Sequence, residues 1–158
     1  MRPGETFKTR GRTVTEADVL AFAGLTGDFH PQHVDPEWAA DSIFGERVAH
    51  GLLVLGIAAG LVRFDPERVL ALRRVRDAVF KRPVALGDTI HVEGEVGAVT
   101  PSGLTSVVLR VVSEDRLVAR IVLDVLWDGD EVTSSEDPNS RGSKDETPIE
   151  LEPGCVPL

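Results

Sequence analysis

The sequence predicts a single α+β domain in which an antiparallel sheet wraps around a long apolar helix. The segment GLLVLGIAAGLV at 51–62 contains no polar side chain, and a helix that is apolar all round must be enclosed by the rest of its domain. Segments with strand character follow it, separated by short turns, at 75–84, 89–96, 104–113 and 117–127. With one more strand expected at 5–13, the order is strand, helices and then a run of strands that should pair as antiparallel neighbours.

The 158-residue chain changes character after residue 127. Residues 1–127 hold 17 acidic and 15 basic side chains, whereas 128–158 holds 9 acidic and 2 basic side chains in a stretch rich in Ser, Pro and Gly. Such a stretch buries too little apolar surface to fold. We therefore expect one folded domain at 1–127 and a disordered acidic tail at 128–158.

Composition and charge argue against several classes of protein. The nearly balanced folded part has no tyrosine, so it lacks the basic face with stacking rings that is typical of nucleic-acid binding. The N-terminus has no signal-peptide core, and the most apolar stretch is too short to span a bilayer. The one cysteine, Cys155, permits no internal disulfide. We expect a cytoplasmic protein that binds neither nucleic acid nor membrane.

Two helix starts frame the most polar motif of the chain, GDFHPQHVD at 27–35. Thr15 and Asp18 match a capping box, so a helix should begin at Thr15 and end before the motif. Asp35 is a favourable N-cap, and the proline after it suits the first position of a second, short helix. The motif itself should therefore be a loop in which Pro31 fixes the bend.

This motif carries the candidate chemical groups. Taken alone, Asp28 could be a turn acid and His33 a solvated loop histidine, or the two could form an acid/base pair. A zinc site would use His30, His33 and an acid. The proline between the histidines, the lack of a nearby cysteine and the capping role of Asp35 argue against zinc. We therefore expect no bound metal.

The motif, the segment VAHGLLVLGIAAGL and the order of elements resemble the MaoC-like (R)-specific enoyl-CoA hydratases, which have the hot-dog fold. The similarity covers most of residues 4–127. The positions that match the family's hydratase motif are Phe22, Thr26, Gly27, Asp28, Pro31 and His33. At three positions the chain departs from the usual residues: His30 replaces an asparagine, Gln32 an aliphatic residue and Ala59 a serine.

The resemblance implies a reaction and a set of site residues. Asp28 and His33 would activate one water, which adds to a trans-2-enoyl thioester or is removed from an (R)-3-hydroxyacyl thioester. The backbone N–H of Gly51, at the start of the apolar helix, would stabilise charge on the thioester oxygen. His30 would have a structural or substrate-contacting role, and His50 could contact the substrate or cap the helix.

The resemblance also implies the partners of the chain. The substrate would be a coenzyme A or acyl-carrier-protein thioester, no cofactor would be needed, and two copies would form a homodimer. Basic side chains just before and within the strand predicted at 75–84 could bind phosphates or an acidic carrier protein, or could be ordinary solvent-facing charges. They are Arg73, Arg74, Arg76, Lys81 and Arg82.

Three other functions stay open. A hot-dog thioesterase commonly uses a carboxylate on its central helix, and 51–62 contains neither an acid nor an amide. A biosynthetic dehydratase or conjugate-addition enzyme that acts on a carrier-bound chain is compatible with the three departures from the family motif. A non-catalytic subunit would have no need to retain both Asp28 and His33.

Overall fold

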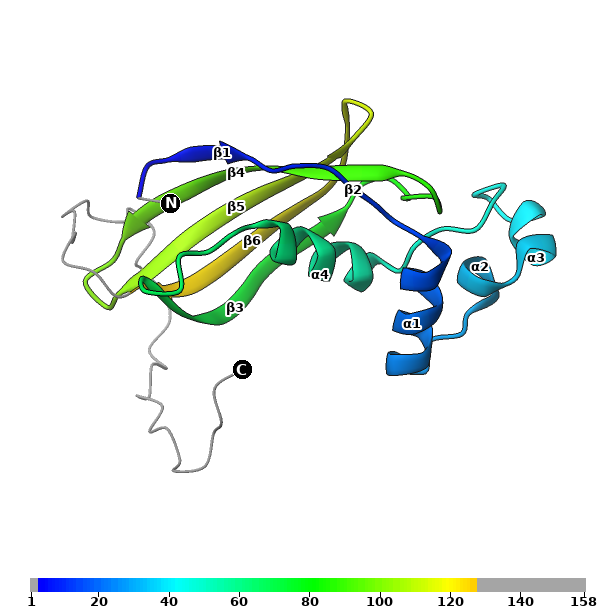
Figure 1. Ribbon diagram of the computed structural model, residues 1–158, viewed down its shortest axis with the longest axis horizontal. Helices are drawn as coiled ribbons and strands as arrows, with labels where there is room; N and C mark the ends of the chain where they lie inside the picture. Colours follow the sequence, from blue (N-terminus) through cyan, green and yellow to red (C-terminus); the bar gives the residue numbers. More distant parts are fainter. Residues whose placement is uncertain (1–2, 128–158) are drawn as a thin grey trace.

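The computed structural model describes residues 3–127 (Figure 1), so the predicted tail at 128–158, with Cys155, lies outside the described residues. The strands are β1 (Thr6–Lys8), β2 (Arg12–Thr13), β3 (Val69–Phe80), β4 (Thr89–Val99), β5 (Leu104–Ser113) and β6 (Arg116–Trp127). The helices are α1 (Glu16–Thr26), α2 (Pro31–Val34), α3 (Pro36–Ala40) and α4 (Gly51–Leu61). The strands form one antiparallel sheet in the order β1-β4-β5-β6-β3, and β2 also pairs with β4. The predicted α+β architecture is confirmed.

The core lies between the sheet and α4, which crosses one face of the sheet (Figure 1). Val54, Ile57 and Ala58 of α4 are buried, at a spacing that places them on one side of the helix. On β6, Ile121 and Leu123 belong to the same core and are separated by one residue, as one face of a strand requires. The helices α1, α2 and α3 gather beyond one end of the sheet (Figure 1).

The prediction that the apolar helix is enclosed on all sides is wrong for the single chain. Leu52 is 64% exposed, and Gly56 and Gly60 are exposed as well. These positions are four residues apart, so they form one stripe along α4, and the sheet covers the opposite side. The helix ends at Leu61, one residue earlier than predicted. No helix within residues 3–127 is long and apolar enough to cross a bilayer.

The N-terminal helices follow the capping signals of the sequence. Thr15 is the N-cap of α1, and its N–H donates to the Asp18 carboxylate at 2.9 Å in the predicted capping box. The helix ends at Thr26, and its C-cap residue Gly27 has a φ of 79°, in the left-handed region that favours glycine. Asp35 caps α3 as predicted. The expected loop, however, contains the short helix α2, because Pro31 is preorganised for a first helical position.

Strand β3 differs most from the prediction. It begins at Val69 rather than at residue 75, and it ends at Phe80. Its register with β6 shifts three times, so the side chains do not alternate regularly along it. A strand without regular alternation gives only a weak signal in the sequence. The strand predicted at 5–13 is divided into β1 and β2.

A buried carboxylate fastens the edge strand β3 to β6. Asp124 of β6 is buried, with only 1% of this residue exposed. Arg74 donates from Nε to its Oδ2 at 2.9 Å, and Arg76 donates to its Oδ1 at 2.6 Å. Both arginines come from β3. Two charge-assisted contacts to one carboxylate therefore join the edge of the sheet to its neighbour.

We expect Asp124→Asn to lower the free energy of unfolding by about 1–3 kcal/mol, because an amide cannot accept from both guanidinium groups as a carboxylate does. Urea denaturation measures the loss. The matched control is Asp77→Asn: Asp77 pairs with Arg120 at 3.1 Å across the same strands, but both side chains are nearly half exposed. It should cost less than about 1 kcal/mol. Equal losses in the two variants would contradict this role of Asp124.

Candidate active site

A pocket of about 550 Å³ lies where the loop after α1, the start of α4 and the end of β3 meet. Four of the residues predicted from the sequence line it: Asp28, His33, His50 and Gly51. Most of the remaining wall is apolar and includes Phe22, Phe44, Phe80, Val84 and Val118. A concave, largely apolar pocket with a few converging polar groups is the general form of a small-molecule site.

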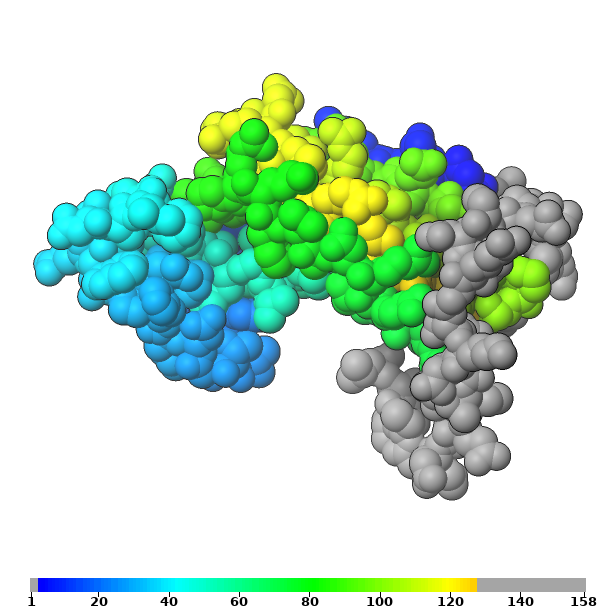
Figure 2. Space-filling view, turned by 180° about the vertical axis from the view of Figure 1, so that it is seen from behind, coloured from blue at the N-terminus to red at the C-terminus, as the bar shows by residue number. Residues whose placement is uncertain are grey.

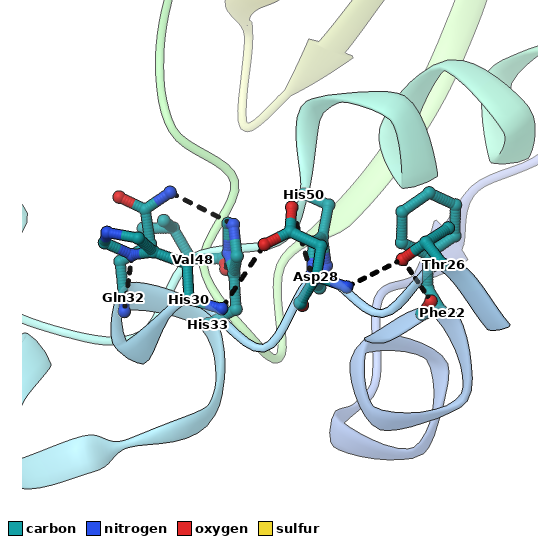
Figure 3. A network of polar contacts seen from close by, with 8 residues as sticks. All are labelled: Phe22, Thr26, Asp28, His30, Gln32, His33, Val48 and His50. Carbon is teal, nitrogen blue, oxygen red and sulfur yellow. Dashed lines mark hydrogen bonds and ion pairs between the residues drawn. The ribbon is translucent and has the colours of Figure 1, made fainter. Parts of the chain in front are cut away.

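Local hydrogen bonds at the end of α1 hold Asp28 in place. The Thr26 hydroxyl donates to the Phe22 carbonyl at 2.7 Å and accepts from the Asp28 N–H at 3.3 Å (Figure 3). The Asp28 carboxylate accepts the N–H of His30 at 3.3 Å. Its side chain is 53% exposed, so this carboxylate stays within reach of water and of a ligand in the pocket.

His33 is buried in the pocket wall with both ring nitrogens engaged. Its Nδ1 lies 2.6 Å from the Val48 carbonyl, and its Nε2 lies 3.0 Å from the side-chain nitrogen of Gln32 (Figure 3). Because a carbonyl oxygen can only accept, Nδ1 must carry a hydrogen. In the neutral ring the lone pair is therefore on Nε2, and this nitrogen is the one that can take a proton.

Burial lowers the pKa of His33 below its ordinary value of 6.5. The Val48 carbonyl acts in the opposite direction because it stabilises the protonated ring, and the neighbouring His50 again lowers the pKa. The net direction is downward. At neutral pH His33 is therefore uncharged and able to act as a base.

His50 is also buried, and it packs directly against His33. The two rings stack with centroids 3.7 Å apart, and Phe22 lies against the His50 ring at 4.9 Å. The His50 Nε2 donates to the backbone carbonyl of Asp28 at 2.9 Å. His50 occupies the N-cap position of α4, as one alternative of the sequence analysis has it, but its side chain makes no capping hydrogen bond to the helix. His50 instead joins the start of α4 to the loop that carries Asp28.

His30 is placed differently from the other candidate residues. It is exposed, and it caps α2 through Nδ1, which accepts the N–H of Gln32 at 3.3 Å. Its ring meets Trp38 edge-on, with centroids 5.4 Å apart. This gives His30 a structural hydrogen bond of the kind an asparagine could make, while a contact with substrate stays a prediction.

Gly51 is the first residue of α4 and lines the pocket. The first backbone N–H groups of a helix have no partners within the helix, so this end of α4 is suited to meet negative charge. A Cβ atom at Gly51 would lie 3.0 Å from the ring of Phe80. A larger residue would therefore require the Phe80 ring to move by a few tenths of an ångström.

One group of residues brings metal-ligand atoms close together. Ligand atoms of Asp28, His33 and His50 all lie within 4.8 Å of one another. This set differs from the zinc alternative of the sequence analysis, which used His30. The two nitrogens of His33 and the Nε2 of His50 already make hydrogen bonds. A metal ion would have to break contacts that hold the site together.

Comparison with known proteins assigns the family. Residues 1–116 match the family described as MaoC-like domain. The chain belongs to this family. The protein MaoC of Klebsiella aerogenes is 45% identical over 93 residues, which are 58% of this chain and 28% of that protein. The (R)-specific enoyl-CoA hydratase of Rhodospirillum rubrum is 32% identical over 90 residues, 57% of this chain and 62% of that enzyme.

A solved structure supports the same assignment. The monoamine oxidase regulatory protein of Archaeoglobus is similar with a TM-score of 0.75 at 36% identity, covering 82% of this chain and 93% of that one. The sheet packed on α4 is accordingly the hot-dog fold that the family resemblance predicts. This MaoC-like chain spans less than two thirds of the length of the two curated relatives above.

Three contributors to the site are not found by reasoning from the sequence. Val48 acts through its carbonyl, which every residue type possesses, and Phe80 reaches the pocket from the irregular strand β3. Gln32 lines the pocket and contacts His33. The visible signal for Gln32 is that it departs from the family motif beside a candidate catalytic histidine.

Proposed function

We propose that this MaoC-like protein hydrates a trans-2-enoyl thioester to an (R)-3-hydroxyacyl thioester, or catalyses the reverse dehydration. The observation that carries the proposal is the meeting of an exposed carboxylate, Asp28, and a neutral buried imidazole, His33, in one largely apolar pocket. An acyl chain suits the apolar wall, and two groups with different proton affinities suit the addition of water. The hydratase name of the Rhodospirillum rubrum relative supports the same reaction.

The reaction requires two proton transfers. In the hydration direction the oxygen of a water bonds to the β-carbon, one proton leaves the water, and one proton is delivered to the α-carbon. We assign the first transfer to Nε2 of the neutral His33, which takes the proton from the water. The Asp28 carboxylate carries no proton at the start, so the proton that reaches the α-carbon by way of this pair is the one that the water lost, and the protein ends with as many protons as it began. Negative charge that develops on the thioester oxygen would be stabilised by the backbone N–H of Gly51.

The substrate carrier would approach along the end of β3. Lys81 and Arg82 line the pocket together with Phe80. Arg82 donates to the Leu117 carbonyl at 2.7 Å, whereas Arg74 and Arg76 pair with Asp124. We therefore propose Lys81 and Arg82, rather than the arginines of β3, as contacts for the phosphates of coenzyme A or of an acyl carrier protein.

We expect Asp28→Asn and His33→Gln each to lower the turnover of crotonyl-CoA by about 10² or more, because each removes a proton-transfer group. Spectrophotometric loss of the enoyl thioester measures the rate. The matched control is Asp35→Asn, in which a nearby carboxylate that caps α3 is changed. This control should retain both turnover and stability, because asparagine caps a helix about as well as aspartate. Undiminished turnover in Asp28→Asn would refute the proposed function.

We propose that the reaction needs no metal or other cofactor. The reason is that three of the four ring nitrogens of His33 and His50 are already hydrogen-bonded. We expect exhaustive dialysis against EDTA to leave the rate of crotonyl-CoA hydration unchanged. A loss of rate that added Zn²⁺ restores would contradict this expectation.

We also propose that the protein is cytoplasmic and forms a homodimer. The two copies would associate through β3. This strand is an edge of the sheet and carries exposed apolar side chains, and Figure 2 shows its green atoms uncovered beside the blue and cyan helical lobe. The exposed apolar residues are Leu70, Leu72, Val75, Val79 and Phe80. A long apolar edge strand is a template for pairing with another strand.

We expect light scattering to give the mass of a dimer, and Val75→Lys to give a monomer because it places a charge in the middle of the edge strand. Leu25→Lys is the matched control, since Leu25 is an exposed apolar residue of α1 and is 83% exposed. It should leave the mass unchanged. A monomeric unmodified protein would refute the proposed assembly.

A further inference from the structure

Gln32 is a neutral polar side chain of the pocket that touches the proposed reacting nitrogen. Its side-chain nitrogen lies 3.0 Å from Nε2 of His33 (Figure 3). The side chain is partly buried and lines the pocket. The proposed mechanism leaves this contact without a role.

The direction of this hydrogen bond follows from the other side of the ring. Nδ1 of His33 donates to the Val48 carbonyl at 2.6 Å, so the neutral ring offers a lone pair at Nε2. The Gln32 group that faces this lone pair must be the NH₂, which donates. An imidazole nitrogen has a single lone pair, so the amide of Gln32 and a reacting water compete for the same position.

The backbone of Gln32 is held from both sides. Its N–H donates to Nδ1 of His30 at 3.3 Å, and its carbonyl accepts the N–H of Val48 at 3.1 Å. The amide therefore extends from a fixed backbone position toward His33. If Nε2 were protonated, its hydrogen would point at an amide donor, and the amide would have to turn to present its oxygen.

We propose that Gln32 is a positioning residue of this site: its side-chain amide occupies the Nε2 lone pair of His33 in the ligand-free protein and leaves it when the reacting water binds. The part that concerns turnover rests on the proposed function, whereas the hydrogen bond itself does not. Gln32 acts through His33 and is not assigned a bond to the substrate.

Several charged and titratable groups around His33 also influence its pKa. Asp28 lies on the loop before α2, His30 caps α2, and His50 stacks on the ring from the start of α4. Lys81 and Arg82, just after β3, line the same pocket. Burial and the neighbouring histidines lower the pKa of His33, and Asp28 acts in the opposite direction. Neutral substitutions at Gln32 leave all of these charges in place.

The test is the pKa of His33 in the ligand-free protein, measured by NMR titration of its ring nitrogens. Gln32→Met keeps the length of the side chain but removes the donor to the neutral ring, so we expect the pKa to rise by about 0.5–1. Gln32→Glu adds an acceptor for the protonated ring and should raise the pKa further. Ser42→Ala removes a hydroxyl that bonds the Ala39 carbonyl, and should leave the pKa unchanged. An unchanged or lower pKa in Gln32→Met would overturn the proposal.

Turnover provides a second readout that a purely structural role would not move. In Gln32→Met the acidic limb of the pH profile of kcat/KM should move to higher pH by the same amount as the pKa of His33 rises. If kcat/KM falls at its plateau in Gln32→Met while the acidic limb stays at the same pH, the proposed role of Gln32 in turnover would be overturned. If no enoyl thioester is hydrated by the unmodified protein, the proposed function fails, while the NMR titration still decides whether Gln32 holds the lone pair.

Discussion

The hydrogen bond between Nδ1 of His33 and the Val48 carbonyl is the contact on which the site depends. It is buried and 2.6 Å long, and it fixes which nitrogen of the ring carries the hydrogen. The backbone of Val48 and Ala49 makes three further contacts. The Val48 N–H donates to the Gln32 carbonyl, Val48 forms a bridge with Ala85, and the Ala49 N–H donates to the Val84 carbonyl at 2.8 Å. One stretch of backbone just before α4 thus ties α2 to the segment between β3 and β4.

The stacking of His33 on His50 follows from this arrangement and limits the charge of the site. Two imidazole rings with centroids 3.7 Å apart repel each other if both are protonated. His50 already donates from Nε2 to the Asp28 carbonyl, a bond that the neutral ring can make. Asp28 adds a half-exposed carboxylate to the same pocket, and Lys81 and Arg82 line it as well. A neutral base beside a solvated carboxylate is a suitable division for chemistry that moves two protons.

The sequence correctly predicts those features of the fold that depend only on residues close together along the chain. Thr15 and Asp35 cap their helices as predicted, because each cap involves only residues of its own first turn. The burial of Asp124 has no local signal in the sequence, because its arginine partners come from a strand some fifty positions away along the chain. The prediction that the apolar helix is enclosed is wrong at Leu52, which is exposed in the single chain. The hydrophobicity of a side chain indicates that it should be buried, but not whether its own chain or another molecule buries it.

The site likewise combines residues that a local motif indicates with residues that come from distant parts of the chain. The motif spacing indicates Asp28 and His33, but Phe80 also lies against the start of α4, where its ring would be 3.0 Å from a Cβ at Gly51. Phe80 ends β3 and is 44% exposed on the edge strand. A partner that pairs with this edge would contact the strand that holds Phe80 against the pocket. If two copies pair through β3 as proposed, the same strand would take part in assembly and, through Phe80, in shaping the pocket beside Gly51.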